Sequence, residues 1–192
     1  MFVAMKKLFR IVKDNAKSIR ATSVEVENPN DEEIINLVNE MHDYLVLSQD
    51  SVVRDKYKIR EGVGLAAPQI GRNIRALVVY YTIEDEKGNV IEKVDHRLIN
   101  PKIILESVKE TYLEGGEGCL SVDEDHKGYV YRKYKIQVKA FNAVTRKEEI
   151  ITARGFEAVV LQHEIDHLNG ILFYDHIDKK DPFKVHQDAV RL

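Results

Sequence analysis

The sequence has little cysteine and no long apolar segment. Its one cysteine, Cys119, cannot form a disulfide within the chain, so nothing points to an oxidising compartment. No segment approaches the ~20 apolar residues that a membrane span requires. Basic residues interrupt the apolar ones in residues 1–17, and no cleavage site follows, so we expect no secretory signal. These absences predict a cytoplasmic protein without a membrane segment.

A concentrated positive charge is also missing. The 192 residues include 29 Lys and Arg against 32 Asp and Glu, and the two signs are interspersed. We therefore expect no sequence-specific binding of nucleic acid, which depends on a basic surface. Repeats and interdomain linkers are absent as well. The chain is expected to form a single domain over 1–192, with an N-terminal arm (1–27) and a C-terminal surface tail (176–192).

The first helix is predicted over 31–47. Asn30 or Asp31 can cap it, and acidic residues follow at its positive end. Apolar residues then recur at helical spacing. The polar stretch 48–62 is predicted to be a loop. The stretch 62–71 contains too much glycine and proline for a helix interior.

Strands are predicted in the middle of the chain from β-forming residues and turn signals. The predicted segments are 76–81, 90–94, 98–105, 129–141 and 147–153, with a hairpin turn at 86–89 and a further strand within 106–114. Pro101 suggests that 98–105 is an edge strand, because proline cannot donate a ladder hydrogen bond.

A second helix is predicted over 155–170, with Asn169-Gly170 as its C-terminal stop signal. Its apolar residues cover most of its circumference, so it should be buried. The order of elements indicates an α+β protein. We expect antiparallel or mixed β-sheets surrounding this central buried helix.

The helix carries an H-E-x-x-H motif formed by His163, Glu164 and His167. Residues four apart share one helix face, so both imidazoles can bind one cation. Glu164 lies about 100° around the helix from His163, within reach of a water on that cation. The alternative is that both are buried core histidines with hydrogen-bond partners.

A catalytic metal site usually takes three protein ligands and leaves one position open. The third ligand must come from elsewhere in the chain. Cys119 is the best candidate, because flanking glycines permit close approach and a thiolate binds a borderline-soft metal well. A lone cysteine can also be a small buried hydrophobe. The other histidines are expected at the surface, and two of them, His126 and His176, remain weaker ligand candidates. These five are His42, His96, His126, His176 and His186.

Three segments together resemble the signature motifs of peptide deformylases. They are Gly62-Val63-Gly64-Leu65-Ala66-Ala67-Pro68-Gln69, Glu117-Gly118-Cys119-Leu120-Ser121 and Gln162-His163-Glu164-Ile165-Asp166-His167-Leu168. They occur in the family's order, and the resemblance runs from about residue 28 to 180. The segment between the first two motifs resembles the longer form typical of Gram-positive bacteria. The N-terminal arm matches less clearly.

The resemblance implies hydrolysis of the N-formyl group from the N-terminal methionine of new polypeptides, with release of formate. It implies one divalent metal ion held by Cys119, His163 and His167, with Glu164 as acid and base. It also implies that the Gln69 amide and the Leu120 N–H stabilise the oxyanion. Fe²⁺ is the expected ion in the cell, and Zn²⁺, Ni²⁺ or Co²⁺ can replace it.

Further residues match the family's substrate-binding positions. The methionine pocket is expected from Val63, Phe156, Val159 and Val160, although plain core packing would account for them almost as well. Gly64 and Gly118 match positions whose backbones bind the peptide as an added strand. Asp166 is expected to be structural, or to orient a metal ligand without binding the metal itself.

Two other functions share some of these features. Zinc endopeptidases also carry H-E-x-x-H, although a thiolate ligand argues against them. A metal or redox sensor could use Cys119, but it would leave Glu164 without a purpose. The expected partners are N-formyl-methionine peptides and nascent chains, and transiently the ribosome.

Overall fold

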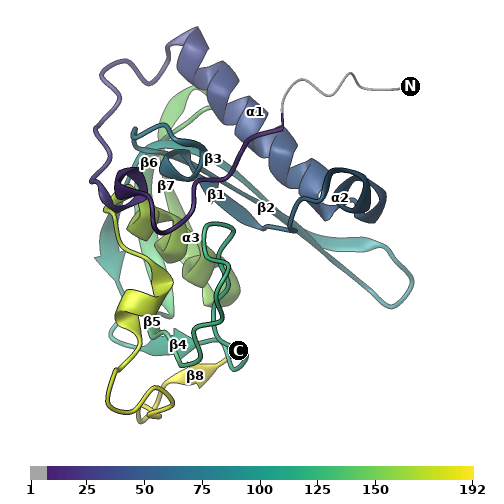
Figure 1. Ribbon diagram of the computed structural model, residues 1–192. Helices are drawn as coiled ribbons and strands as arrows, with labels where there is room; N and C mark the ends of the chain where they lie inside the picture. Colours follow the sequence, from purple (N-terminus) through teal and green to yellow (C-terminus); the bar gives the residue numbers. More distant parts are fainter. Residues whose placement is uncertain (1–7) are drawn as a thin grey trace.

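The computed structural model describes residues 8–192, so Lys6 and Lys7 of the predicted arm lie outside the described residues. Within that range the fold is α+β, as predicted, with mainly antiparallel strands (Figure 1). The helices are η1 (Lys17–Arg20), α1 (Glu32–Gln49), α2 (Ser51–Tyr57), η2 (Ala67–Ile70), α3 (Gly155–Leu168) and η3 (Phe173–His176). The strands are β1 (Gly64–Ala66), β2 (Ala76–Glu84), β3 (Val90–Glu106), β4 (Glu110–Tyr112), β5 (Arg132–Lys133), β6 (Lys135–Asn142), β7 (Lys147–Arg154) and β8 (Val190–Arg191). None of these helices is long and apolar enough to cross a membrane.

The larger sheet has the strand order β1-β2-β3-β6-β7, and every neighbouring pair is antiparallel. Side chains of β2 alternate between its two faces, as the pleat of a strand requires. Leu77 and Val79 pack in one core cluster with residues of α3. Ala76 and Val78 pack in a second cluster with residues of α1. The sheet therefore lies between two helices (Figure 1).

The first predicted helix is present as α1. The Asp31 carboxylate accepts a hydrogen bond from the Glu33 N–H at 2.8 Å and caps the helix. The predicted surface position of His42 is wrong, because its side chain is buried between α1 and the sheet. Its ring packs edge-on against Tyr80, and its Nε2 lies 3.3 Å from a carboxylate oxygen of Asp95. Partners on β3 approach its Nε2, whereas its Nδ1 has no hydrogen-bond partner among residues 8–192.

The predicted loop over 48–62 is wrong in part, because α2 occupies seven of its residues. The Asp50 side chain accepts hydrogen bonds from the N–H groups of Val52 and Val53 and starts this helix. No residue of α2 is buried, so the apolar periodicity that usually indicates a helix is absent.

The strands predicted over 90–94 and 98–105 form one continuous strand, β3. β2 pairs with β3 as far as Ile99, and β6 pairs with it from Leu98 onward, so the part beyond Pro101 is paired on one side, in agreement with the predicted edge position. The proline is accommodated at an irregularity where the register to β6 shifts between Ile99 and Lys102. Asn100 there has a φ of 52°, and the displaced backbone removes the need for an N–H from Pro101.

A second sheet has the order β5-β4-β8 and contains the end of the chain. The strand predicted over 129–141 is split, since β5 belongs to this sheet and β6 to the larger one. The predicted C-terminal tail is mostly exposed, yet its last residues return to the sheet. Val190 and Arg191 pair in parallel with Thr111 and Tyr112 of β4.

The helix α3 begins directly after β7 and ends at Leu168, with Asn169 as its C-cap, close to the predicted bounds. Ten of its fourteen residues are buried. Gly170 follows with a φ of 73°, a conformation that suits glycine. A side chain there would also lie 2.3 Å from the Arg20 carbonyl oxygen. The end of α3 therefore packs closely against η1.

Candidate metal centre

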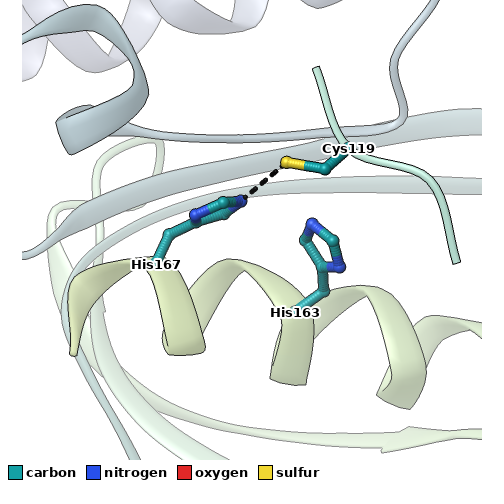
Figure 2. Close-up of side chains that lie close together, drawn as sticks. All are labelled: Cys119, His163 and His167. Carbon is teal, nitrogen blue, oxygen red and sulfur yellow. Dashed lines mark hydrogen bonds between the residues drawn. The ribbon is translucent and has the colours of Figure 1, made fainter. Parts of the chain in front are cut away.

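Two turns of α3 bring His163 and His167 to the same face, opposite the loop that carries Cys119 (Figure 2). One ligand atom from each of the three residues lies within 4.8 Å of the others. The Cys119 Sγ lies 3.2 Å from the His167 Nε2. A thiolate and two imidazoles at this spacing can hold one divalent ion. His126 and His176, the weaker ligand candidates, are not part of the cluster.

The ring of His163 is oriented by a carboxylate. Its Nδ1 lies 2.7 Å from the Glu117 Oε2, which leaves the Nε2 to face the cluster. Burial opposes the charge on His163, but contacts with Cys119 and Glu117 outweigh it and hold the His163 pKa well above its usual value. The contact with Glu117 therefore fixes the ring with its Nε2 toward the thiol, and a metal that binds there must displace the proton from this nitrogen.

Glu117 is in turn held by a buried arginine. The Arg132 Nε donates to the Glu117 Oε1 at 2.8 Å, and a second guanidinium nitrogen donates to its Oε2 at 3.0 Å. Both side chains are 4% exposed. Burial alone would raise the pKa of Glu117, but hydrogen bonds from His163 and Arg132 lower it to about 2. The carboxylate therefore stays ionised beside His163.

Asp166 supports the same arginine from its other side. Its carboxylate accepts a hydrogen bond from the Arg132 guanidinium and lies 2.7 Å from the His176 Nε2. Desolvation opposes ionisation of Asp166, yet the bonds from His176 and Arg132 keep its pKa below the usual value. Hydrogen bonds thus connect Asp166 to His163 through Arg132 and Glu117. A chain of paired charges connects the cluster to the partly exposed His176.

Glu164 is buried against β1 next to the cluster. Its side chain is 4% exposed, and among residues 8–192 its Oε2 has no hydrogen-bond partner. Burial is the main cause that raises its pKa to about 7. The carboxyl can therefore hold or release a proton near neutral pH. A Cβ at Gly64 would lie 2.2 Å from the Glu164 Oε1, so only glycine leaves room for this side chain.

The Gln69 amide lies on the Cys119 side of the cluster. The Ala66 N–H donates to its Oε1 at 2.7 Å, which orients the amide. Its Nε2 donates to the Ser121 Oγ at 3.3 Å and lies 3.6 Å from the Cys119 Sγ. The Leu120 N–H makes no hydrogen bond within the described range, although Leu120 lines the adjoining cavity. Both groups can donate to a ligand at this place.

A cavity of about 250 Å³ opens beside the cluster. Every predicted substrate-binding residue lines it, together with the predicted acid, the two predicted oxyanion donors and two members of the cluster. These are Val63, Gly64, Gln69, Gly118, Cys119, Leu120, Phe156, Val159, Val160, His163 and Glu164. Val159 and Val160 are 2% and 6% exposed, whereas Phe156 is 39% exposed and stands at the rim. The cavity can take one apolar side chain next to the candidate metal centre.

His167 lies deeper than the rest and does not line the cavity. Desolvation, reinforced by the positive charge on His163, lowers the pKa of His167 well below its usual value. Its imidazole is therefore neutral, as a metal ligand must be. Its Nδ1 is buried without a partner in the part of the chain that the structure describes. The donor set fits a divalent cation, and His167 is already in the neutral form that binding needs.

The sequence alone did not indicate Glu117 and Arg132 as supports of His163. Glu117 lies within the second motif, two residues before Cys119, so it could have been noticed. Arg132 sits in a segment predicted only as a strand. Their contacts join residues 15 and 46 positions apart, and no local pattern reports such pairs. Leu113 of the cavity wall was missed for the same reason.

Comparisons with known proteins identify the same family as the three sequence motifs. The family described as polypeptide deformylase matches residues 8–183. A peptide deformylase from Macrococcus caseolyticus is 47% identical over 180 residues, which cover 94% of this chain and 95% of the relative. The crystal structure of peptide deformylase from Ehrlichia chaffeensis matches with a TM-score of 0.73 at 33% identity, covering 92% of this chain and 91% of that one. A Met-Ala-Ser-bound peptide deformylase from Acinetobacter baumannii matches with a TM-score of 0.71 at 26% identity, covering 89% and 99%.

Proposed function

This chain belongs to the polypeptide deformylase family, and we propose that the buried Cys119–His163–His167 cluster is its active site. The reaction is removal of the N-formyl group from nascent polypeptides. The observation that carries the proposal is the meeting of this cluster with the Glu164 carboxyl at one small cavity. The family is metal-dependent, and the donor set suits one ion per chain. When bound, a divalent ion supplies Lewis acidity and a nucleophile at neutral pH.

Glu164 is proposed as the proton carrier. Its carboxylate accepts a proton from the attacking water and later delivers it to the nitrogen of the leaving methionine. A pKa raised to about 7 suits both steps, because the group can be in either form near neutral pH. Its burial beside Gly64 keeps bulk water away from the proton during the reaction.

Gln69 and Leu120 are proposed to stabilise the oxyanion that forms when the formyl carbon is attacked. The Gln69 Nε2 and the Leu120 N–H both border the cavity next to Cys119. The bond from Ala66 fixes the Gln69 amide before substrate arrives, so little reorganisation is needed. Losing one such donor typically costs about 10²–10³ in kcat.

The substrate is proposed to bind along β1 with its methionine side chain in the cavity. β1 is an edge strand of the larger sheet, so its outer side can take a further extended strand. Gly64 lies in this strand, and Gly118 lines the cavity with it. Val63, Phe156, Val159 and Val160 would enclose the methionine. The Met-Ala-Ser bound to the Acinetobacter relative has the length and first residue of such a product.

The finer assignments rest on the chemistry of the residues. We propose Fe²⁺ as the ion in the cell, with Zn²⁺, Ni²⁺ or Co²⁺ able to bind the same donors. A cytoplasmic location with transient contact to the ribosome suits an enzyme that acts on nascent chains. Residues 1–192 are proposed to form one catalytic domain with an arm (1–27) and a tail (176–192). Contacts of Val12 with Gln69 and of Val190 with Thr111 tie both ends to the rest.

Formate release from formyl-Met-Ala-Ser by protein reconstituted anaerobically with Fe²⁺ tests the site. We expect turnover by the wild type and none by Glu164→Ala at equal metal content. Glu157→Ala is the matched control, because Glu157 lies on the same helix but bonds to His96 at 2.7 Å instead. Cys119→Ala should lose both tight metal binding and turnover. Full activity in Glu164→Ala would overturn the acid/base assignment, and unchanged metal affinity in Cys119→Ala would overturn the ligand assignment.

A further inference from the structure

The chain turns sharply directly after Cys119, and this turn presents the Leu120 N–H. The Val122 N–H donates to the Cys119 carbonyl at 3.3 Å and closes a four-residue turn. The Cys119 carbonyl and the Leu120 N–H are opposite ends of one planar peptide. The direction of the proposed oxyanion donor therefore depends on how firmly the peptides of this turn are held.

Two of the turn's peptides are held by the N-terminal arm. The Lys13 ammonium donates to the Leu120 carbonyl at 3.1 Å. The N–H of the next arm residue, Asp14, donates to the Ser121 carbonyl at 3.0 Å. The far end of the Leu120–Ser121 peptide is held too, because the Ser121 N–H lies 3.4 Å from the Cys119 Sγ. The turn is thus fixed from inside by Cys119 and from outside by the arm.

The arm also reaches the second proposed oxyanion donor. The Val12 N–H donates to the Gln69 carbonyl at 2.7 Å. One short stretch, 12–14, therefore bonds to the backbones of both Gln69 and the Leu120 turn. These two segments are about 50 residues apart in the sequence, and the arm joins them through residues that do not line the cavity.

Lys13 bonds to the turn through its side chain, whereas Asp14 does so through its backbone N–H. Its ammonium also donates to the Asp123 carboxylate at 2.6 Å, just beyond the turn. The Lys13 side chain is 39% exposed, so its stem buries little apolar surface. Its contribution to the turn is therefore the hydrogen bond to the Leu120 carbonyl. A charged donor makes a stronger bond to a carbonyl than a neutral one, and an ammonium can serve both acceptors at once.

We infer that Lys13 is a positioning residue for deformylation, which holds the Cys119–Val122 turn so that the Leu120 N–H meets the oxyanion. The inference rests on the proposed function, because it assigns to Lys13 the orientation of a donor proposed there. Lys13 touches neither the substrate cavity nor the cluster. Its effect is therefore expected on the rate of the chemical step and not on metal content.

The test replaces Lys13 by methionine, which keeps an unbranched stem and removes the donor. K13M should lower kcat for formyl-Met-Ala-Ser roughly 10-fold, less than the loss of a whole oxyanion donor. KM and the metal content should change little. K13R, which keeps a cationic donor, should recover most of the rate. A purely structural role would not give this split between kcat and KM with rescue by arginine.

Hydrogen exchange gives a readout that is independent of activity. In metal-free and zinc-loaded K13M, the Ser121 and Val122 amides should exchange faster than in the wild type. Amides of α3 should be unchanged. Asp123→Asn removes the ion pair but leaves the bond to Leu120, so its kcat should stay close to wild type. Lys139→Met is the control for loss of a surface ion pair, here the pair with Glu148 at 3.2 Å.

Wild-type kcat together with wild-type exchange at Ser121 and Val122 in K13M would overturn the inference. So would a D123N variant as slow as K13M, since the ion pair alone would then account for the effect. The proposed function has its own criterion. If Glu164→Ala stays active, the proposed site fails whatever K13M shows; if Glu164→Ala is inactive and K13M behaves as wild type, only the role of Lys13 falls.

Discussion

The helices α1 and α3 differ in what they bury. α1 has 18 residues, and five of its seven buried side chains are apolar. α3 has 14 residues and buries nearly its whole circumference, including the polar residues Gln162, His163, Glu164 and His167. α1 starts at a side-chain cap, Asp31, whereas no side chain caps the start of α3. Apart from the His42 Nδ1, which has no hydrogen-bond partner within residues 8–192, the first helix meets the usual requirements of stability, and the second departs further from them.

Hydrogen bonds satisfy only some of the buried polar groups of α3. Gln162 bonds to both backbone groups of Lys133 at 2.9 Å, and His163 bonds to Glu117. The Glu164 Oε2 and the His167 Nδ1 have no partner within residues 8–192. A buried polar group without a hydrogen bond costs about 1–3 kcal/mol. Such a cost persists where function requires it, so α1 should respond to mutation mainly in stability and α3 mainly in activity.

The largest effect is expected from Glu164→Gln on α3. The amide keeps the shape of the carboxyl but cannot exchange the proton, so kcat should fall about 10²–10⁴-fold. The free energy of unfolding should not fall, because a buried ionisable group is removed. Steady-state kinetics and urea unfolding of the metal-free protein check both quantities. A clear loss of stability with kcat retained would reverse the comparison.

Met41→Ala on α1 should show the opposite pattern. Met41 is fully buried between α1 and the sheet. Truncation leaves a cavity, and the free energy of unfolding should fall by about 2–5 kcal/mol. The kcat of the protein that remains folded should match wild type. Val52→Ala on α2, where the side chain is 73% exposed, should leave stability unchanged. A fall in kcat at temperatures where Met41→Ala is folded would contradict the division of roles.

Gly64→Ala tests the packing of β1 against α3. The added Cβ would meet the Glu164 carboxyl and must displace it. We expect kcat to fall about 10²-fold, because a misplacement of about 1 Å can cost that much. Gly115→Ala is the matched control, since a Cβ there meets nothing within 4 Å. Wild-type kcat in Gly64→Ala would show that Glu164 works equally well from another position.

Glu117→Gln removes the charge that orients His163 from outside α3. Metal affinity should fall about 10–100-fold, the usual effect of losing such a support. Competition with a chelator measures it directly. Glu110→Gln is the control, because Glu110 pairs with Lys133 and His186 away from the cluster. Equal affinities in both variants would mean that α3 positions His163 unaided.

The smallest effect concerns the helix starts. Asp31→Ala removes the cap of α1 and should lower the free energy of unfolding by about 1 kcal/mol. Arg154→Ala, at the corresponding position before α3, should change it little, because no side-chain bond is lost there. Thermal unfolding of both variants compares them. An equal loss in the two would show that capping does not distinguish these helices.

Local patterns in the sequence were enough to predict several parts of the molecule. The cap and the periodicity of α1, the turn at 86–89 and the bounds of α3 depend on residues a few positions apart. The spacing of His163 and His167 likewise follows from the geometry of one helix. Residues that act through such short-range geometry can be identified before any fold is known.

Other features depended on partners far along the chain. The joining of two predicted strands into β3, the pairing of β8 with β4 and the burial of His42 all result from contacts between distant segments. The surface helix α2 has no buried residue and so gives no apolar periodicity.

The features of the site also fall into those set by local sequence and those set by contacts between distant segments. The sequence by itself determined which residues could bind a metal, because thiol, imidazole and carboxyl groups have fixed chemistry. Only the tertiary structure decided that Glu117 and Arg132 orient His163, that Gly64 makes room for Glu164, and that Lys13 holds the Leu120 turn. Those contacts depend on where separate segments meet, and that is set by the packing of the whole core.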